Sequence, residues 1–418
     1  MGQYVVIADD LTGALDTAIQ FTSGGAGAVV LRYRPEDVDA LLRRRRRLAP
    51  DAAVAVVDIA SRHLPPDQAA ARVQATVAAA RTANATSGDA PPRFYKKTDS
   101  ALRGNIGAEL DALLSASGAD VVCFVPAHPA LGRTTVDGVH LIDGQPLGTS
   151  EFARDARQPV KLSSVPVIIS QQTTVPVQTI TTRQVYAGET LQRVPRRIVV
   201  CDAATAEDLR AAGRWLKGQE VRYEPAGCGG FASEISNVWD VAEVPDATGT
   251  IEGAVTDEPE APECASRGML VVCGSRHRRS RDQVRAALDS KTFTLNRTAD
   301  ARFGVIVSDN VPVGDPDSVA WSLADTALKH MRADPPAVLT VFGGDTAAAV
   351  LDAMEVRTIR PVYEYDAGVV VSAIDSGVLP ETRLLVTKAG GFGGERLLVE
   401  MHRQFEWLVR RGIRCTLR

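Results

Sequence analysis

Two adjacent carboxylates stand at the end of the first apolar run of the chain. Tyr4–Ala8 is apolar and β-branched, and Asp9 and Asp10 follow it directly. An aspartate beside a substrate hydroxyl can accept the hydroxyl proton during phosphoryl transfer. Adjacent residues of a strand point in opposite directions. We therefore expect one aspartate, with Asp10 favoured, to face a ligand. The other would cap the helix that begins at Leu11 or orient a cation.

A second polar cluster follows another short apolar run. Lys97, Asp99 and Arg103 come after the strand candidate Phe94–Lys96. An arginine holds a carboxylate through a two-pronged hydrogen-bond fork, so these residues indicate a polar, anionic ligand. The alternatives are purely structural: a helix cap for the aspartate pair, and a surface salt-bridge network for this cluster.

The second half of the chain carries two glycine-rich turns, each directly after an apolar run. They are Gly343–Thr346 and Lys388–Gly394, and Ser275 follows a third apolar run. Glycines at a strand-to-helix turn let backbone N–H groups approach an anion, and the helix dipole adds to the attraction. Neither turn is a Walker loop. Each could also be a tight turn, with Asp345 or Thr346 as the helix cap. Together they predict a phosphate site with the residues Ser275, Gly343, Gly344, Asp345, Thr346, Gly390 and Gly391.

The elements that must position these residues alternate between strand and helix in the first half of the chain. Such alternation indicates an α/β fold with a mainly parallel sheet covered on both faces. In such sheets, ligands bind beyond the carboxyl ends of the strands. The expected strands are Tyr4–Ala8, Ala28–Leu31, Ala53–Ile59, Phe94–Lys96, Val121–Val125, Arg197–Cys201 and Val221–Tyr223. The expected helices are Leu11–Phe21, Gln68–Arg81, Ile106–Leu114 and Thr205–Leu216.

A second α/β pattern follows an acidic, proline-rich segment, which we interpret as a linker at 246–267. We therefore expect two domains, 1–245 and 268–418, with the active site in the cleft between them. The stretch 127–195 is rich in turn residues, and we interpret it as a lid or insertion. The strands expected after the linker are Met269–Cys273, Gly304–Val307, Ala337–Phe342, Val369–Val371 and Leu384–Thr387. The helices are Ser280–Ser290, Ser318–Met331, Thr346–Met354 and Glu395–Arg410.

Composition narrows the class of protein. The 418 residues are 45% hydrophobic, enough for sizeable cores, and the formal charge of −4 does not point to nucleic acid or to a membrane surface. The basic run Arg43–Arg47 suits the end of a helix. Six scattered cysteines without a Cys-x-x-Cys pair, and no visible signal peptide or membrane span, indicate a cytoplasmic protein. Neither a metal-binding residue nor an oligomeric state can be inferred.

Five motifs resemble the four-carbon acid sugar kinase family. They occur in the family's order and cover nearly the whole chain, and the first two are long and specific. The motifs are Ile7–Ala14 with Asp16, Lys96–Leu110, Gly132–Gly138, Gly343–Thr346 and Thr387–Gly393. The chain departs from the family at His128, often Phe there, at Ala156, often Pro, and in the basic run Arg276–Arg279, where small hydroxyl residues are usual.

The resemblance implies an ATP-dependent kinase with magnesium. The N-terminal domain would bind the sugar acid and the C-terminal domain ATP. Phosphate would pass to the terminal hydroxyl of threonate, erythronate or 3-oxo-tetronate. Matched by motif, the substrate-side residues are Asp9, Asp10, Lys97, Asp99 and Arg103, and the nucleotide-side residues are Ser275, Gly343, Gly344, Asp345, Thr346, Gly390 and Gly391.

Two other classes of protein stay open. One is a nucleotide-dependent oxidoreductase of a hydroxy acid. The first strand is not followed by Gly-x-Gly-x-x-Gly, and Asp9 and Asp10 would repel a pyrophosphate there. The other is a non-catalytic sensor of a sugar acid or nucleotide, which would bind both ligands without turnover.

Overall fold

The computed structural model divides the chain into two compact units, unit 1 (Met1–Pro245) and unit 2 (Asp246–Arg418). The described residues are 4–23, 27–34, 38, 40, 42–43, 49, 52–155, 157–192, 196–239, 241, 267–295, 302–308 and 315–414. The predicted linker, 246–267, lies outside them apart from Arg267, as do Ala156 and most of the basic run at 43–47.

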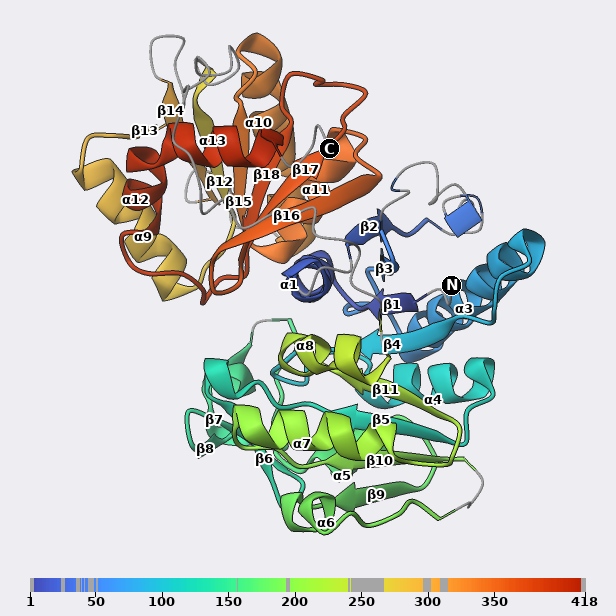
Figure 1. The fold of residues 1–418 in the computed structure, drawn as a ribbon. Coiled ribbons are helices and arrows are strands. Elements are labelled where there is room, and N and C mark those ends of the chain that lie inside the picture. The colour runs from blue at the N-terminus through green and yellow to red at the C-terminus, as the bar shows by residue number, and fades with distance from the viewer. Residues whose placement is uncertain are drawn as a thin grey trace, which may run out of the picture. The chain divides into compact units, whose positions relative to one another are not determined.

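Unit 1 is built on a parallel sheet (Figure 1). Its described strands lie in the order β2-β3-β1-β4-β11-β5-β10-β9, and every pairing between them is parallel. Four of these eight strands, β2, β3, β5 and β10, are buried along their whole length, and β1 and β4 are buried after their first residue, as expected for a sheet covered on both faces. The strands are β1 (Tyr4–Ala8), β2 (Ala28–Arg32), β3 (Val54–Asp58), β4 (Arg93–Lys97), β5 (Val121–Val125), β9 (Val177–Ile180), β10 (Arg197–Cys201) and β11 (Tyr223–Gly227).

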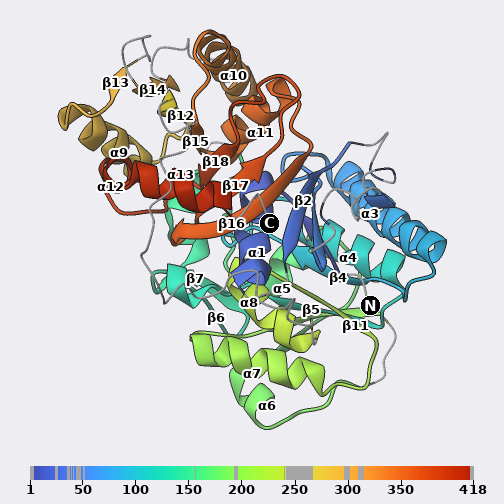
Figure 2. The ribbon, with the colours of Figure 1, turned by 45° about the horizontal axis from the view of Figure 1, so that its top comes forward.

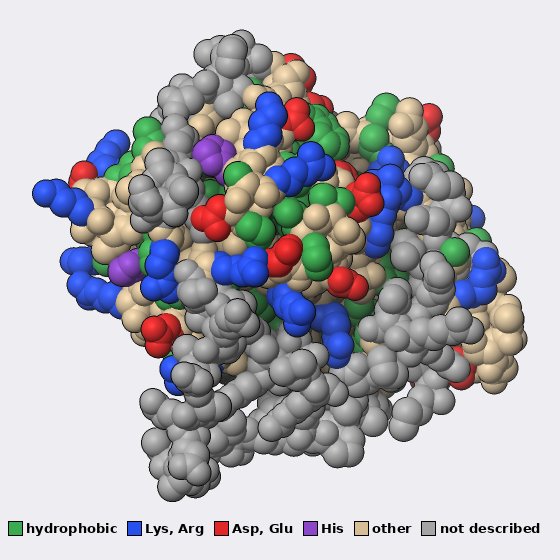
Figure 3. Space-filling view, turned by 90° about the horizontal axis from the view of Figure 1, so that it is seen from above, with side chains coloured by type: hydrophobic (Ala, Val, Ile, Leu, Met, Phe, Trp, Pro, Cys, Tyr) green, Lys and Arg blue, Asp and Glu red, His purple; other side chains and the backbone are tan. Residues whose placement is uncertain are grey.

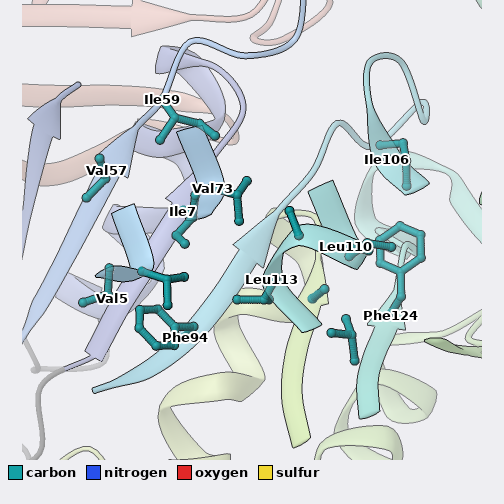
Figure 4. Packing of buried hydrophobic residues seen from close by; sticks show 14 of the residues in the cluster. Val5, Ile7, Val57, Ile59, Val73, Phe94, Ile106, Leu110, Leu113 and Phe124 are labelled. Carbon is teal, nitrogen blue, oxygen red and sulfur yellow. The ribbon is translucent and has the colours of Figure 1, made fainter. Parts of the chain in front are cut away.

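Helices pack on both faces of this sheet (Figures 1 and 2). One hydrophobic cluster joins the sheet to α3, α4 and α5, and Figure 4 shows members of this cluster from the sheet, such as Val5, Ile7 and Phe94, and from α4, Leu110 and Leu113. The other face is covered by α1, α7 and α8, with α6 against α7. The helices are α1 (Leu11–Ser23), α3 (Pro66–Ser87), α4 (Ile106–Ser117), α5 (Val165–Ser170), α6 (Thr182–Tyr186), α7 (Ala206–Lys217) and α8 (Gly229–Val238).

The stretch 127–195 contains more regular structure than its turn-rich sequence indicates. Its first part forms a separate three-stranded antiparallel sheet with short 3₁₀ helices. Its second part contributes α5, α6 and β9, and β9 pairs with β10 of the main sheet. The interpretation as a lid or insertion is therefore wrong for the second part, because pairing with β10 makes it part of the domain. The small sheet consists of β6 (Arg133–Val136), β7 (Val139–Ile142) and β8 (Gln145–Pro146).

Unit 2 has a mixed sheet in the order β13-β14-β12-β15-β18-β17-β16. The first five strands pair in parallel, and β17 pairs antiparallel with both β18 and β16. Our sequence analysis missed β16, whose burial alternates along the strand and so lacks a continuous apolar run. The strands are β12 (Met269–Cys273), β13 (Thr294–Leu295), β14 (Phe303–Val307), β15 (Val338–Phe342), β16 (Thr358–Asp366), β17 (Val369–Ile374) and β18 (Leu384–Lys388).

Five described helices complete unit 2, and a second hydrophobic cluster packs α9, α12 and α13 onto its sheet. The single helix expected at Glu395–Arg410 is two helices, because the backbone leaves the helical conformation at Gln404. Basic and acidic side chains are interspersed on the face shown in Figure 3. The helices are α9 (Arg278–Asp289), α10 (Pro316–Ala333), α11 (Gly344–Ala353), α12 (Leu397–Arg403) and α13 (Phe405–Arg414).

The α/β class with mainly parallel sheets is confirmed. Most strands lie within one or two residues of their expected positions, because buried parallel strands read as short apolar runs. The strand expected at Val221–Tyr223 lies instead at Tyr223–Gly227. None of the described helices is long and apolar enough to cross a membrane.

Candidate functional site

The polar residues of unit 1 gather at one edge of its sheet. Strands β3, β1 and β4 are parallel neighbours, with Asp58, Ala8 and Lys97 in register at their carboxyl ends. The segments that follow these strands therefore leave the sheet side by side. Together with Lys97 at the end of β4, these segments carry all five residues that the sequence analysis assigned to the substrate side.

Arg62, which follows β3, joins the two adjacent aspartates. Its Nε lies 2.7 Å from Asp9 Oδ2, and its Nη2 lies 2.7 Å from Asp10 Oδ1. Its Nη2 also lies 3.6 Å from Asp99 Oδ1. One guanidinium thus neutralises part of the charge of three carboxylates. The sequence analysis did not assign Arg62 to the site, although the strand expected at Ala53–Ile59 ends just before it. The strand-end rule would have placed Arg62 there.

Arg103 forms its two-pronged fork with a residue of the same cluster. Its Nε and Nη2 donate to the two oxygens of Asp99 at 2.8 and 2.9 Å, and its Nη1 donates to Asp155 Oδ2 at 3.1 Å. Burial acts to raise the pKa of Asp99, but the charges of Arg103 and Arg62 outweigh burial and hold this pKa well below the usual range. Arg103 therefore holds Asp99 in place as a charged acceptor.

The two aspartates at the end of β1 have different hydrogen bonds. Asp10 accepts from the N–H of Gly13 at 2.9 Å and from the Thr12 hydroxyl at 2.7 Å, as well as from Arg62. It therefore caps the first turn of α1. Asp9 pairs with Arg62 through Oδ2, whereas its buried Oδ1 has no hydrogen-bond partner among the described residues. Burial acts to raise the pKa of Asp9, but Arg62, Lys96 and Lys97 lower it.

Two adjacent lysines end β4 and point to opposite faces of the sheet. Lys96 forms an ion pair with Glu109 at 2.7 Å and belongs to the core. Lys97 is 4% exposed, and its Nζ has a single hydrogen bond, to the Thr98 carbonyl at 2.9 Å. A Cβ on Gly13 would lie 2.7 Å from this Nζ, so Gly13 makes room for Lys97 beside α1. The Lys97 ammonium retains donors that no described residue accepts.

The stretch 127–195 supplies further residues to this edge. Gln158 donates from Nε2 to the Arg62 carbonyl at 2.6 Å, and its buried Oε1 has no partner among the described residues. No local sequence pattern indicates Gln158, because it lies in a loop 96 positions from Arg62. His128 is mostly buried; burial, together with Lys97 and Arg133, lowers its pKa to about 4. His128 is therefore neutral near pH 7.

The predicted nucleotide-side residues also lie together, at one edge of the sheet of unit 2. They follow β12, β15 and β18, which are adjacent parallel strands. A Cβ on Gly390 would lie 2.6 Å from Ser275 Oγ, and one on Gly343 would lie 3.4 Å from the Ser275 nitrogen. The N–H of Gly343 donates to the Lys388 carbonyl at 3.2 Å. The three loops therefore form one backbone-rich surface.

The loop after β15 turns directly into α11. Gly343 adopts a φ of 107°, which favours glycine, and α11 begins at Gly344. The expectation that Asp345 or Thr346 caps this helix is wrong, because both lie inside its first turn. Asp345 is exposed there and Thr346 is buried. The first-turn N–H groups of a helix attract anions, so this turn suits a phosphate.

A buried lysine lies under the loop after β18. Lys388 Nζ donates to Ser280 Oγ at 3.0 Å and to the carbonyls of Ala389 and Gly390 at 3.2 and 3.1 Å. Burial lowers the pKa of Lys388 to about 7, and Arg279 acts in the same direction. The basic run Arg276–Arg279 leads into α9, which begins at Arg278, and its three arginines are exposed.

Comparison with known proteins places both halves of the chain. A family model described as a sugar-binding N-terminal domain matches residues 4–235, and one described as a nucleotide-binding C-terminal domain matches residues 304–398. Two solved structures have the same fold at 19% identity. A Salmonella typhimurium protein covers 97% of this chain with a TM-score of 0.69, and a Haemophilus influenzae protein covers 96% with a TM-score of 0.62; each is itself covered completely.

Curated relatives are more similar in sequence. A D-threonate kinase of Bordetella bronchiseptica is 32% identical, and the match covers 95% of this chain and 96% of that protein. A D-threonate kinase of Cupriavidus necator is 30% identical, over 94% of this chain and 96% of that protein. A D-erythronate kinase of Heliobacterium modesticaldum is 35% identical over 53% of this chain and 50% of that protein. These relatives are named as kinases, which supports a phosphotransferase activity for this protein. The chain belongs to the four-carbon acid sugar kinase family.

Proposed function

We propose that the protein is an ATP-dependent kinase that phosphorylates the terminal hydroxyl of a four-carbon sugar acid such as threonate, erythronate or 3-oxo-tetronate. The observation that carries this proposal is the polar cluster of unit 1. It combines two buried acceptors that have no hydrogen-bond donor among the described residues with a buried ammonium that uses only one of its three donors there. Buried polar groups are nearly always hydrogen-bonded, so unused ones point to a ligand.

A small sugar acid complements these unused groups. Its hydroxyls can donate to Asp9 Oδ1 and Gln158 Oε1, both of which are buried acceptors without a partner. Its carboxylate can accept from Lys97, whose ammonium uses one of its three donors. Asp9, Asp10 and Asp99 already occupy Arg62 and Arg103. Lys97 is therefore the cation we assign to the substrate carboxylate.

The hydrogen bonds of Asp9 and Asp10 support a choice between the two candidates for the general base. In the transfer, the substrate hydroxyl oxygen bonds to the γ-phosphorus of ATP, the bond from this phosphorus to the ADP oxygen breaks, and the hydroxyl proton moves to a carboxylate. Asp10 uses both oxygens to cap α1 and to bind Arg62. Asp9 retains a buried oxygen for a hydroxyl proton. We therefore assign proton acceptance to Asp9.

Unit 2 supplies the groups that we assign to ATP. The glycine loops after β15 and β18 and Ser275 after β12 present backbone N–H groups and a hydroxyl to the phosphates. The described residues contain no group of three His, Cys, Asp or Glu side chains that could hold a metal. Magnesium carried by nucleotide phosphates needs one or two carboxylates, and the exposed Asp345 fits that role. When bound, magnesium neutralises charge that develops on the phosphates.

The experiment is ADP release from ATP with a panel of four-carbon acids, each with and without magnesium. We expect release with at least one of threonate, erythronate and 3-oxo-tetronate, and none without an acid. The matching four-carbon polyols, which lack the carboxylate, should be much poorer acceptors. Binding of acid and ATP without release would indicate a sensor instead. Binding of NAD without binding of ATP would indicate an oxidoreductase.

A further inference from the structure

Two side chains of α9 donate hydrogen bonds to carbonyl groups of the glycine-rich segment 389–394, which follows β18. Ser280 Oγ donates to the Gly390 carbonyl at 2.9 Å. Gln283 Nε2 lies 3.0, 3.1 and 2.8 Å from the carbonyl oxygens of Phe392, Gly393 and Gly394. Both side chains are fully buried. Four carbonyls of one short segment therefore point toward α9.

The chemistry of these contacts fixes the orientation of the Gln283 amide. Its nitrogen faces three acceptors, and its Oε1 is buried without a partner among the described residues. The opposite orientation would bring an oxygen against three carbonyl oxygens, which repel it. The Gln283 amide therefore has one orientation, in which its Nε2 group holds all three carbonyl oxygens of the segment.

The captured carbonyls determine where the N–H groups point. In a trans peptide, the C=O of one residue and the N–H of the next point in opposite directions, and no cis peptide occurs among the described residues. The N–H groups of Gly391 and Gly393 consequently point away from the side chains that hold Gly390 and Phe392. Neither N–H donates to any described residue.

We infer that Ser280 and Gln283 are positioning residues that hold segment 389–394 with the N–H groups of Gly391 and Gly393 turned toward the phosphates of the nucleotide; the N–H groups of Phe392 and Gly394 are used within the protein, by the Ala389 carbonyl and by Asp366. This inference rests on the proposed function, and it assigns to α9 a role in phosphate binding that requires no contact with the ligand. Without the brace, the glycine-rich segment would sample many conformations, and binding would have to order it again.

The test is calorimetric titration of the full-length protein with ATP, ADP, AMP and the sugar acid. Ser280→Ala and Gln283→Met remove the donors and keep the side chains compact. We expect each to weaken ATP and ADP about tenfold, as the loss of one or two hydrogen bonds would. AMP should weaken less, and the sugar acid should bind as to wild type. Ser280→Thr, which keeps the hydroxyl, should retain ATP affinity.

The matched control is Ser290→Ala at the end of the same helix. The Ser290 hydroxyl donates to the Ala287 carbonyl at 2.7 Å and does not touch the segment, so ATP affinity should not change. Gly391→Ala separately tests the segment as a phosphate site. Its Cβ would lie 3.4 Å from the nearest atom, a ring nitrogen of His277, so the fold accepts it.

The outcomes separate the inference from the proposed function. If Gly391→Ala weakens ATP while Ser280→Ala and Gln283→Met bind it normally, the segment binds phosphate without needing the brace, and the inference is wrong. If all three variants bind ATP like wild type, the segment is not the phosphate site and the nucleotide assignment fails as well. If Gln283→Met does not fold, as judged by its thermal melting, the Ser280 pair decides the question.

Discussion

Arg62 organises the candidate substrate site of unit 1. It is 11% exposed and contacts Asp9, Asp10 and Asp99, which come from two other segments of the chain. A charge buried with its partners adds little net stability, but removing one partner leaves the others uncompensated. Removal of Arg62 should therefore lower the free energy of unfolding much more than removal of a surface arginine.

We predict that Arg62→Gln lowers the free energy of unfolding by about 3–5 kcal/mol and weakens sugar-acid binding. The matched control is Arg222→Gln, because Arg222 pairs with Asp120 at 3.0 Å but its side chain is 75% exposed. Such surface pairs contribute about 0–1 kcal/mol. Urea unfolding of both variants measures the difference. Similar losses in the two variants would contradict the role of Arg62.

The second prediction separates the two aspartates after β1. Asp9→Asn removes the carboxylate to which we assign proton acceptance, so kcat should fall about 10²-fold or more, with KM for the acid little changed. Asp10→Asn should have a smaller effect, because asparagine also caps helices well. Steady-state kinetics of both variants measures this. A larger kcat loss in Asp10→Asn would restore the assignment that the sequence favours.

At the scale of elements, the sequence predicted strands best where burial alone decides them. β1, β5, β10 and β12 lie where their apolar runs predict them. The predicted position of β11 was wrong because Pro225 and Gly227 have low strand propensity. In the structure, parallel pairing with β4 and β5 overrides that propensity.

The predicted site residues follow the same logic. The rule that ligands bind beyond the carboxyl ends of parallel strands predicted that Asp9 and Asp99 lie at one edge of their sheet, and the glycine loops at one edge of theirs. In the structure they lie after adjacent parallel strands. It could not predict that Gln283 braces a segment about 110 positions later, since no local pattern marks that contact. The same holds for Asp155, whose partner Arg103 lies 52 positions earlier.

The small sheet of unit 1 contains a buried histidine that should make its stability depend on pH. His140 on β7 lies 2.9 Å from the Ser100 carbonyl through Nε2 and 3.0 Å from the Thr135 hydroxyl through Nδ1. Burial lowers the pKa of His140 to about 4, and Arg133 acts in the same direction, while Ser100 and Asp99 oppose it. The imidazole is therefore neutral in the native state.

The sign of the pH effect follows from linkage. Below the unfolded pKa of about 6.5, the unfolded chain binds a proton that the native state does not bind until about pH 4. Stability therefore falls as pH decreases through this window, by up to about 3 kcal/mol. His140→Gln lacks this component, while His128 stays in both proteins. Urea unfolding at pH 7 and pH 4.5 should show a smaller loss in the variant. Equal losses would mean that His140 does not titrate in this window.

At the scale of the whole molecule, the described residues include two separate hydrophobic clusters. One lies entirely within unit 1 and the other entirely within unit 2. The two family models likewise match separate halves of the chain. Repeated strand and helix patterns made this α/β organisation predictable, because each pattern is local in sequence. The antiparallel strands of unit 2 were harder to predict, because pairing partners rather than apolar runs define them.

The last prediction assigns each ligand to its own unit in the intact chain. Hydrogen–deuterium exchange of backbone amides slows where a ligand accepts their hydrogen bonds or suppresses local opening. With ADP alone, we expect slower exchange in 343–346 and 389–394, where the glycine loops would contact phosphate. With the sugar acid alone, we expect it in 9–16, 61–64 and 96–103. Peptides of α7 serve as the internal control, because this helix carries no candidate ligand residue. Protection of the unit 1 segments by ADP alone, without change in 389–394, would overturn the assignment of the two ligands to the two units.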